Sequence, residues 1–226
     1  MSETITLNSK VDDAPFQALH VQPHGRRRGG IVVVQEIFGI DRFMRADAER
    51  WAGLGFEVLV PSMFDRQQPG FVAEHDPDGL REGFQYAQAN ELDNPVADVE
   101  TCLDFLAPRG PVFVVGYCYG GGIAWLSACR IEDLAAASCY YGGMIQAYAQ
   151  ETPRCPVVLH FGGQDQHIPA ETVRAAVASH HPDLPVHIYE DGGHGFNNEG
   201  GMAYEEASAT LARRRTLELF EQNGAA

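Results

Sequence analysis

The sequence is short of positive charge. Against 31 acidic residues it has 16 lysines and arginines, which gives a formal net charge of −15. Nucleic acids and anionic membranes bind basic faces, so this balance argues against both as partners. The one basic run, three arginines at 26–28, lies between two glycines and is too short for a nucleic-acid-binding arm. We interpret it as a solvated turn before a strand.

Long apolar runs and paired cysteines are also lacking. The longest apolar runs, IVVV and PVFVVG, are too short to span a membrane, and the opening stretch MSETITLNSKVDD is polar, so we expect neither a leader nor an anchor. An odd set of five cysteines without close spacing favours reduced thiols and a cytoplasmic location. No CxxC and no Cys/His cluster with metal-ligand spacing occurs, so we expect no metal and no organic cofactor.

What the sequence does contain is a regular alternation of strand-like and helix-like segments. The β-branched run GGIVVVQE is typical of a strand buried on both faces of a parallel sheet. We expect further strands at 5–9, 16–22, 56–64, 111–117, 135–143, 155–163 and 186–193, and helices at 42–55, 94–106, 120–130, 169–180 and 205–222. The second of these helices would be capped and begun by Asn94-Pro95.

This alternation predicts an α/β fold, a doubly wound and mostly parallel sheet flanked by helices. An apolar content of 45% and a length of 226 residues suit one globular domain over 1–226. The stretch at about 65–90 is interrupted by prolines and glycines. We interpret it as a lid-like excursion over the sheet rather than a regular crossover.

One short stretch concentrates the chemistry. In VFVVGYCYGGGIAWL, Cys118 stands between Gly116 and Gly120 where a strand gives way to a helix. This is the glycine–x–nucleophile–x–glycine pattern with cysteine in place of serine. A nucleophile on so sharp a turn tends to have strained dihedrals, and glycines two residues to either side let the turn close. The alternative is that Cys118 is only a small buried residue at a glycine-rich helix contact.

A thiol nucleophile needs a base, and the base needs an orienting acid. In the α/β-hydrolase order the acid follows the nucleophile and the histidine comes last. HFGGQDQHIP places Asp165 just past a strand, and YEDGGHGFNN places His194 in a glycine-rich loop after the last strand. Both lie at carboxyl ends of strands, where such sheets bind ligands. We therefore expect a Cys118–His194–Asp165 triad.

Other residues compete for these roles. His167, two residues from Asp165, is the second candidate for the base, whereas Asp191 is better read as a turn former than as the triad acid. His160 falls within a strand and is interpreted as a core residue. We expect three histidines to lie at the surface: His180, His181 and His187. The remaining cysteines are interpreted as structural: Cys102, Cys129, Cys139 and Cys155.

Glu36 also needs an explanation. It ends the strand IVVVQE and begins IFG, the turn where this architecture normally builds half of its oxyanion hole. A carboxylate is unfavourable beside a developing oxyanion, so the position suggests a specific role. The alternative is that Glu36 only caps a neighbouring turn.

With QEIFG, GYCYGG, GGQD and GHGF in this order, the chain resembles the dienelactone hydrolase family (carboxymethylenebutenolidases) of the α/β-hydrolase superfamily, from about residue 5 to 220. The resemblance implies that Cys118 is the nucleophile, His194 the base and Asp165 its orienting acid. It implies an oxyanion hole made by the backbone N–H groups of Ile37 and Tyr119. The glutamate that in this family holds the resting thiol protonated, and takes its proton when substrate arrives, corresponds to Glu36.

The resemblance weakens at the substrate. The family holds a substrate carboxylate with arginines, and GLREGFQY offers Arg81 in the expected segment, although Arg81 could equally be a surface residue of a lid helix. The second arginine is absent, because HGFNN has Asn197 and Asn198 at that place. Such a change removes a charge-assisted hydrogen bond of about 1.5–3 kcal/mol. A muconolactone-type substrate therefore does not follow, and Asn198 becomes a candidate substrate contact.

We thus expect a hydrolase that opens a small-molecule lactone through a thioester acyl-enzyme, which water then cleaves. The alternatives are a hydrolase of a different carboxylic ester or thioester, an acyl transferase, and a catalytically idle thiol-bearing scaffold. We expect a monomer or a small homo-oligomer.

Overall fold

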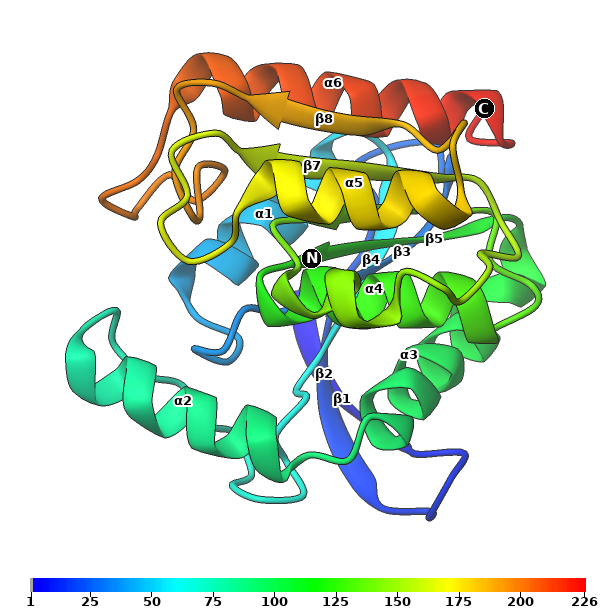
Figure 1. The fold of residues 1–226 in the computed structure, drawn as a ribbon. Helices are drawn as coiled ribbons and strands as arrows, with labels where there is room; N and C mark the ends of the chain where they lie inside the picture. Colours follow the sequence, from blue (N-terminus) through cyan, green and yellow to red (C-terminus); the bar gives the residue numbers. More distant parts are fainter. Residues whose placement is uncertain (1) are drawn as a thin grey trace.

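The computed structural model describes residues 2–226 as an eight-stranded sheet flanked by helices (Figure 1). The strand order is β1-β2-β4-β3-β5-β6-β7-β8. Strands β3 to β8 run parallel, whereas β1 and β2 pair antiparallel at one edge. The strands are β1 (Ser2–Asn8), β2 (Pro15–Val21), β3 (Gly29–Val34), β4 (Phe56–Pro61), β5 (Val112–Tyr117), β6 (Ala136–Tyr140), β7 (Val157–Gly162) and β8 (Val186–Tyr189). The predicted doubly wound, mostly parallel sheet is confirmed.

Helices cover both faces of the sheet. Helices α1 and α6 pack on one face, and α3, α4 and α5 on the other, while α2 lies beyond the end toward which the parallel strands point (Figure 1). The helices are α1 (Arg42–Gly53), α2 (Pro77–Ala89), α3 (Asp93–Leu106), α4 (Tyr119–Arg130), α5 (Ala170–His180) and α6 (Glu206–Gln222), with 3₁₀ turns η1 (Ala107–Arg109) and η2 (Gly143–Tyr148). No helix among residues 2–226 combines the length and the apolar character needed to cross a membrane.

The central strands are buried along their whole length, which is why their sequences are continuous rather than alternating. Every residue of β3, β4 and β5 is buried. Aromatic rings join the sheet to the helices of one face: Phe113 of β5 stacks on Phe220 of α6 at 4.4 Å between ring centres, and Trp51 of α1 packs on the same ring. The carboxyl ends of β3, β5, β7 and β8 are thereby held at one edge.

One expectation about helices is wrong, the capping of α3 by Asn94. Helix α3 begins at Asp93, its N-cap position is Leu92 without a side-chain hydrogen bond, and Asn94 lies inside the helix instead of capping it. The excursion at 65–90 contains the regular 13-residue helix α2, which is capped by Asp76 and has Pro77 in its first turn. Its glycines are packing contacts rather than breaks.

Two of the three histidines expected at the surface are half-buried. His181 Nε2 lies 2.9 Å from the carbonyl oxygen of Glu151, and the His181 ring packs edge-on to Trp125. His187 stacks on His160 within the sheet. Only His180 is exposed. The tertiary neighbours of these rings come from distant parts of the chain, so the local sequence could not predict their burial.

Candidate active site

Cys118 stands in a strained turn between β5 and α4. Its backbone has φ 54° and ψ −112°, a left-handed conformation that costs a non-glycine residue free energy. The turn is closed so tightly that a Cβ added to Gly120 would lie 2.6 Å from the carbonyl oxygen of Gln35, and one added to Gly116 would overlap the backbone of Gly120. The two glycines are therefore required by the backbone, as the sequence pattern predicts.

The structure brings together the three residues of the predicted triad. His194 Nε2 lies 3.2 Å from Cys118 Sγ, and His194 Nδ1 lies 2.8 Å from Asp165 Oδ2. The other carboxylate oxygen of Asp165 accepts hydrogen bonds from the backbone N–H groups of His167 and Ile168, at 2.8 and 3.0 Å. His167 thus contributes its backbone to the orienting acid, and His194 is the imidazole that bridges thiol and carboxylate.

The electrostatics of this row favour a protonated imidazole next to the sulfur. Burial by itself lowers the pKa of His194, but the hydrogen bonds to Asp165 and Cys118 outweigh it and raise the pKa to about 10. Burial raises the pKa of Asp165, and its bonds from His194 and the two backbone amides more than offset that, so the net shift is downward. A carboxylate–imidazolium pair therefore stands beside Sγ, where it can stabilise negative charge on sulfur.

The two backbone amides expected to form an oxyanion hole lie on either side of the nucleophile. Ile37 follows β3, and Tyr119 is the first residue of α4, where helical N–H groups have no intrahelical partner. Among the described residues, the Ile37 amide donates no hydrogen bond to another backbone group, and the Tyr119 amide donates none outside α4. The phenol of Tyr119 points elsewhere, since its hydroxyl lies 3.3 Å from Asn90 Nδ2.

Glu36 is buried next to the triad, with 5% of its surface exposed. Burial raises the pKa of Glu36, the charge of Asp41 adds to this, and nearby His194 and His75 oppose it; the net direction is upward. Asn198 Nδ2 donates to Glu36 Oε2 at 3.1 Å. Within residues 2–226 no hydrogen bond joins Glu36 to Cys118, so its role in holding the thiol proton stays a prediction.

A second histidine–carboxylate pair lies in the same cleft and was not found from the sequence. His75 Nε2 is 2.6 Å from Asp41 Oδ2, and the His75 ring stacks on Phe38 at 3.9 Å between ring centres. Asp41 also caps α1, accepting from the amide of Met44 at 2.9 Å. The bond to Asp41 outweighs burial and raises the pKa of His75. An aspartate before a helix was a readable capping signal, but nothing in the sequence linked it to His75.

Two cavities meet at the nucleophile and form one cleft with two arms. Both are lined by Cys118, His194, Ile37 and Leu80. The first, which we call the polar arm, has a volume of about 580 Å³ and is further lined by Glu36, Arg42, Glu74, His75, Asp76 and Asn198. The second, which we call the apolar arm, has a volume of about 720 Å³ and is further lined mainly by Phe84, Ala87, Tyr119, Met144, His167 and Ile168.

The candidate substrate contacts differ in their surroundings. Arg81 lies on α2 at the edge of the apolar arm, its side chain is 66% exposed, and Nη1 forms an ion pair with Asp78 at 2.9 Å. Asn198 lines the polar arm, but it is 4% exposed and its amide is bonded to Glu36. Neither side chain therefore presents a buried, unpaired cation to a substrate carboxylate.

An ionic network that starts from the buried Asp47 and reaches the surface at Glu199 supports the site. Tyr117, the residue before the nucleophile, donates its hydroxyl proton to Asp47 Oδ2 at 2.7 Å, and Arg50 donates to Asp47 Oδ1 at 2.8 Å. Arg50 also pairs with Glu199, at 2.6 Å, and Glu199 with Arg213 of α6 at 3.1 Å. The Cys118 turn and the loop after His194 are thus tied to the same charges.

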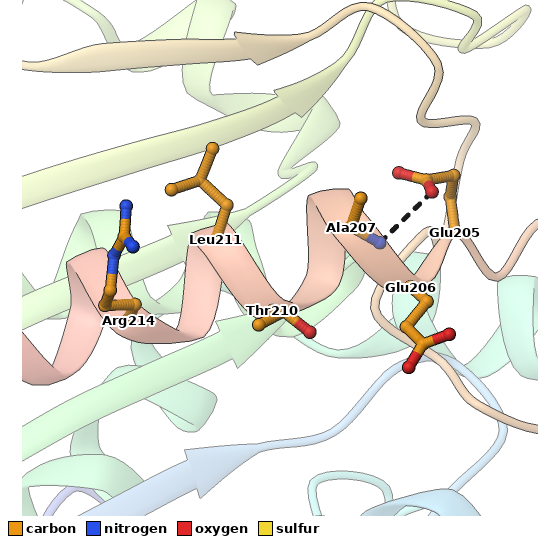
Figure 2. Close-up of a pocket in the computed structure, with 6 residues that line it drawn as sticks. All are labelled: Glu205, Glu206, Ala207, Thr210, Leu211 and Arg214. Carbon is orange, nitrogen blue, oxygen red and sulfur yellow. Dashed lines mark hydrogen bonds between the residues drawn. The ribbon is translucent and has the colours of Figure 1, made fainter.

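Outside the cleft, the described residues offer a further hollow and no metal centre. The hollow, about 530 Å³, follows the start of α6, where Glu205 accepts a hydrogen bond from the Ala207 amide (Figure 2). It shares no lining residue with the cleft and contains neither a nucleophile nor a base close to one. Residues 2–226 contain no group of three or more His, Cys, Asp or Glu side chains placed to hold a metal ion.

Comparison with known proteins agrees with this geometry. The model of the dienelactone hydrolase family matches residues 16–224. The carboxymethylenebutenolidases of Pseudomonas putida and Pseudomonas knackmussii are each 31% identical over 97% of this chain and 96% of their own. A crystal structure from Klebsiella pneumoniae has a TM-score of 0.83 at 24% identity, covering 98% of this chain and 99% of its own. A dienelactone hydrolase-like promiscuous phosphotriesterase from metagenomic libraries has a TM-score of 0.78 at 20% identity, covering 98% of each chain.

Proposed function

As a member of the dienelactone hydrolase family, this chain is a hydrolase of lactones or carboxylic esters, and we propose that it acts through a thioester formed on Cys118. The observation that carries the proposal is the unbroken row from Sγ to His194 Nε2, at 3.2 Å, and from His194 Nδ1 to Asp165, at 2.8 Å. A row of nucleophile, base and orienting acid is the arrangement that acyl transfer requires.

In the first half-reaction the sulfur, its proton held by His194, attacks the carbonyl carbon of the substrate. The carbonyl oxygen becomes an oxyanion and accepts hydrogen bonds from the backbone N–H groups of Ile37 and Tyr119. As the C–O bond to the leaving oxygen breaks, His194 gives its proton to that oxygen. The products of this step are an alcohol or enol and a thioester on Cys118; in a lactone the two remain joined in one opened chain.

In the second half-reaction His194 is neutral and can act as a base toward water. Water adds to the thioester carbonyl while His194 takes one of its protons, and the oxyanion forms again at the same two amides. Collapse breaks the C–S bond, releases the carboxylic acid and leaves the sulfur beside a protonated His194. Asp165 keeps the imidazole in the orientation needed for both proton transfers.

Glu36 is proposed to act on the thiol indirectly in the resting enzyme. Its carboxylate is buried close enough to His194 for each charge to affect the other. A substrate that brought a negative charge into the polar arm would displace or neutralise this carboxylate, because two negative charges in one buried site repel each other. Substrate entry and thiol activation would then be coupled, as the family resemblance suggests.

The relatives named carboxymethylenebutenolidase make a dienelactone the first substrate to test. A second candidate, a different carboxylic ester or thioester, is favoured by two observations. Asn198 stands where the family pattern has an arginine and is bonded to Glu36. Arg81 is exposed and paired with Asp78. Neither of these two side chains is thus placed to recognise a substrate carboxylate.

Intact-protein mass spectrometry after brief exposure to a cis-dienelactone or to p-nitrophenyl acetate tests the proposal. We expect an acyl adduct that maps to Cys118 and disappears as product forms; Cys139→Ala, a buried thiol of β6, is the matched control and should acylate normally. Turnover of p-nitrophenyl acetate but not of the dienelactone would support the mechanism and indicate that the natural substrate is a different ester. Absence of adduct and turnover with both compounds would contradict the proposal and favour the idle scaffold.

A further inference from the structure

Helix α2 turns an apolar stripe toward the nucleophile. Leu80, Phe84 and Ala87 are spaced i, i+4 and i+7, so they lie on one face of the helix, and all three line the apolar arm. Leu80 is 51% and Phe84 56% exposed. Large apolar side chains exposed together beside a catalytic group are typical of a ligand-binding surface.

The opposite wall of the apolar arm is also apolar and comes from other parts of the chain. Met144 belongs to η2, and Ile168 follows Asp165 in the loop before α5. Cys118 and Tyr119 close the arm at its inner end. A group lying in this arm would therefore run from the reacting carbonyl outward between α2 on one side and η2 on the other.

The stripe is held in a fixed position by residues of α2 that flank it. A Cβ added to Gly83 would overlap the carbonyl oxygen of Ile37, so the helix backbone rests directly on the oxyanion turn. Tyr86 packs on Phe71 at 4.8 Å and on Phe64 at 6.1 Å between ring centres. Because the wall is already formed, a ligand spends little free energy in ordering it.

The two arms are suited to different parts of a substrate. The polar arm carries Glu36, His75 and Asn198 beside His194, so it can hold water and a polar leaving group where the imidazole must protonate or deprotonate them. During the reaction the acyl group stays bound to sulfur, whereas the leaving group departs and water takes its place. Water must therefore enter the arm that holds the leaving group, and the apolar arm can hold the acyl group without admitting water.

We infer that the apolar arm binds the acyl part of the substrate, and that the preferred substrates are esters or thioesters of an apolar carboxylic acid with several carbon atoms beyond the carbonyl. The inference rests on the proposed function, since it assumes acyl transfer to Cys118. It deepens that function by assigning the acid part of the substrate to one cavity and the leaving group to the other.

The test is a series of p-nitrophenyl esters from acetate to octanoate. It is joined by the isomers ethyl octanoate and octyl acetate, which have alkoxide leaving groups of similar basicity and carry the long chain on the acyl side and on the alcohol side. Each methylene buried in the apolar arm is expected to raise kcat/KM about three- to fourfold until the arm is full. Phe84→Ala, which changes the apolar arm alone, should lower the octanoate-to-acetate ratio of kcat/KM at least about tenfold. Leu54→Ala, which removes a leucine that is 41% exposed and lies outside the cleft, should keep the ratio.

Two results would overturn the inference. One is a kcat/KM in the native chain that stays level or falls from p-nitrophenyl acetate to p-nitrophenyl octanoate. The other is a higher kcat/KM for octyl acetate than for ethyl octanoate, which would assign the arm to the leaving group. Neither depends on a variant that has to fold. An acetyl adduct on Cys118 together with a level chain-length series would reject the inference alone, whereas absence of any adduct would reject the proposed function.

Discussion

Replacing Gly120 with alanine is the most direct test of the strained turn on which the site is built. The new Cβ would stand 2.6 Å from the carbonyl oxygen of Gln35 and closer still to that of Val34, whereas real Cβ contacts stay above 3.0 Å. Both obstacles are backbone, so the end of β3 or the start of α4 has to move. Overpacking of this kind costs about 1–3 kcal/mol, and here we expect about 3.

For a chain of this size, about 3 kcal/mol lowers the melting temperature by roughly 6–12 °C. The same movement displaces the amide of Tyr119 and the sulfur of Cys118 relative to each other, and a misplacement of about 1 Å costs about a hundredfold in rate. Differential scanning calorimetry and the hydrolysis of p-nitrophenyl acetate measure the two effects.

Gly53→Ala is the matched control. Gly53 is the last residue of α1, and an added Cβ there would meet nothing within 4 Å. Alanine is the better helix former by about 0.5–1 kcal/mol, so this variant should melt at the native temperature or slightly above it with full activity. A Gly120→Ala protein that melted within about 2 °C of the native chain and hydrolysed ester at the native rate would refute the account of the turn given above.

Three further predictions concern the catalytic groups. Cys118→Ala should keep the native melting temperature and lose at least about 10³-fold in turnover; substantial remaining ester hydrolysis in a clean preparation would exclude Cys118 as nucleophile. Burial raises the pKa of Glu36 above its usual 4.5, so ionising it destabilises the fold. Glu36→Gln should therefore melt at a higher temperature than the native chain near about pH 8, with the difference closing toward about pH 4, and should change the rate at which iodoacetamide alkylates Cys118. If neither the melting profile nor the alkylation rate changes, Glu36 is a structural residue. The pKa of His194 is raised from 6.5 to about 10, so its contacts stabilise the fold fully below about pH 6.5 and this contribution is lost as the pH rises through about 10. In Asp165→Asn the melting temperature should therefore fall less steeply over this pH range than in the native chain. An equally steep fall would show that the Asp165 carboxylate is not the source of the stabilisation.

The arrangement of the triad could be predicted because each part of it has a local cause. A nucleophile on a sharp strand-to-helix turn requires small residues two positions away, and Gly116 and Gly120 record that requirement in the sequence. Asp165 and His194 follow strands of a parallel sheet, so both had to emerge at the same edge. Local backbone constraints and the direction of the strands were sufficient.

The walls of the cleft could not be predicted, because they depend on where α2 packs. Gly79 and Gly83 look like helix breakers in the sequence, whereas in the structure they let the helix rest against other backbone segments. The bond between His75 and Asp41 joins residues 34 positions apart that share no motif. Arg81 did carry a local signal that was overlooked: Asp78, three residues earlier on the same helix, is placed to pair with it.

The network around Asp47 has a consequence for how the site loses order. Tyr117 connects it to the nucleophile turn, and Glu199 connects it to the loop that carries the histidine. Segments that share a buried anchor open together in one local unfolding event rather than separately. The backbone amides of both segments should therefore exchange with solvent deuterium at a common rate. If they do, Cys118 and His194 lose their ordered positions together, and the thiol is seldom exposed without the histidine beside it.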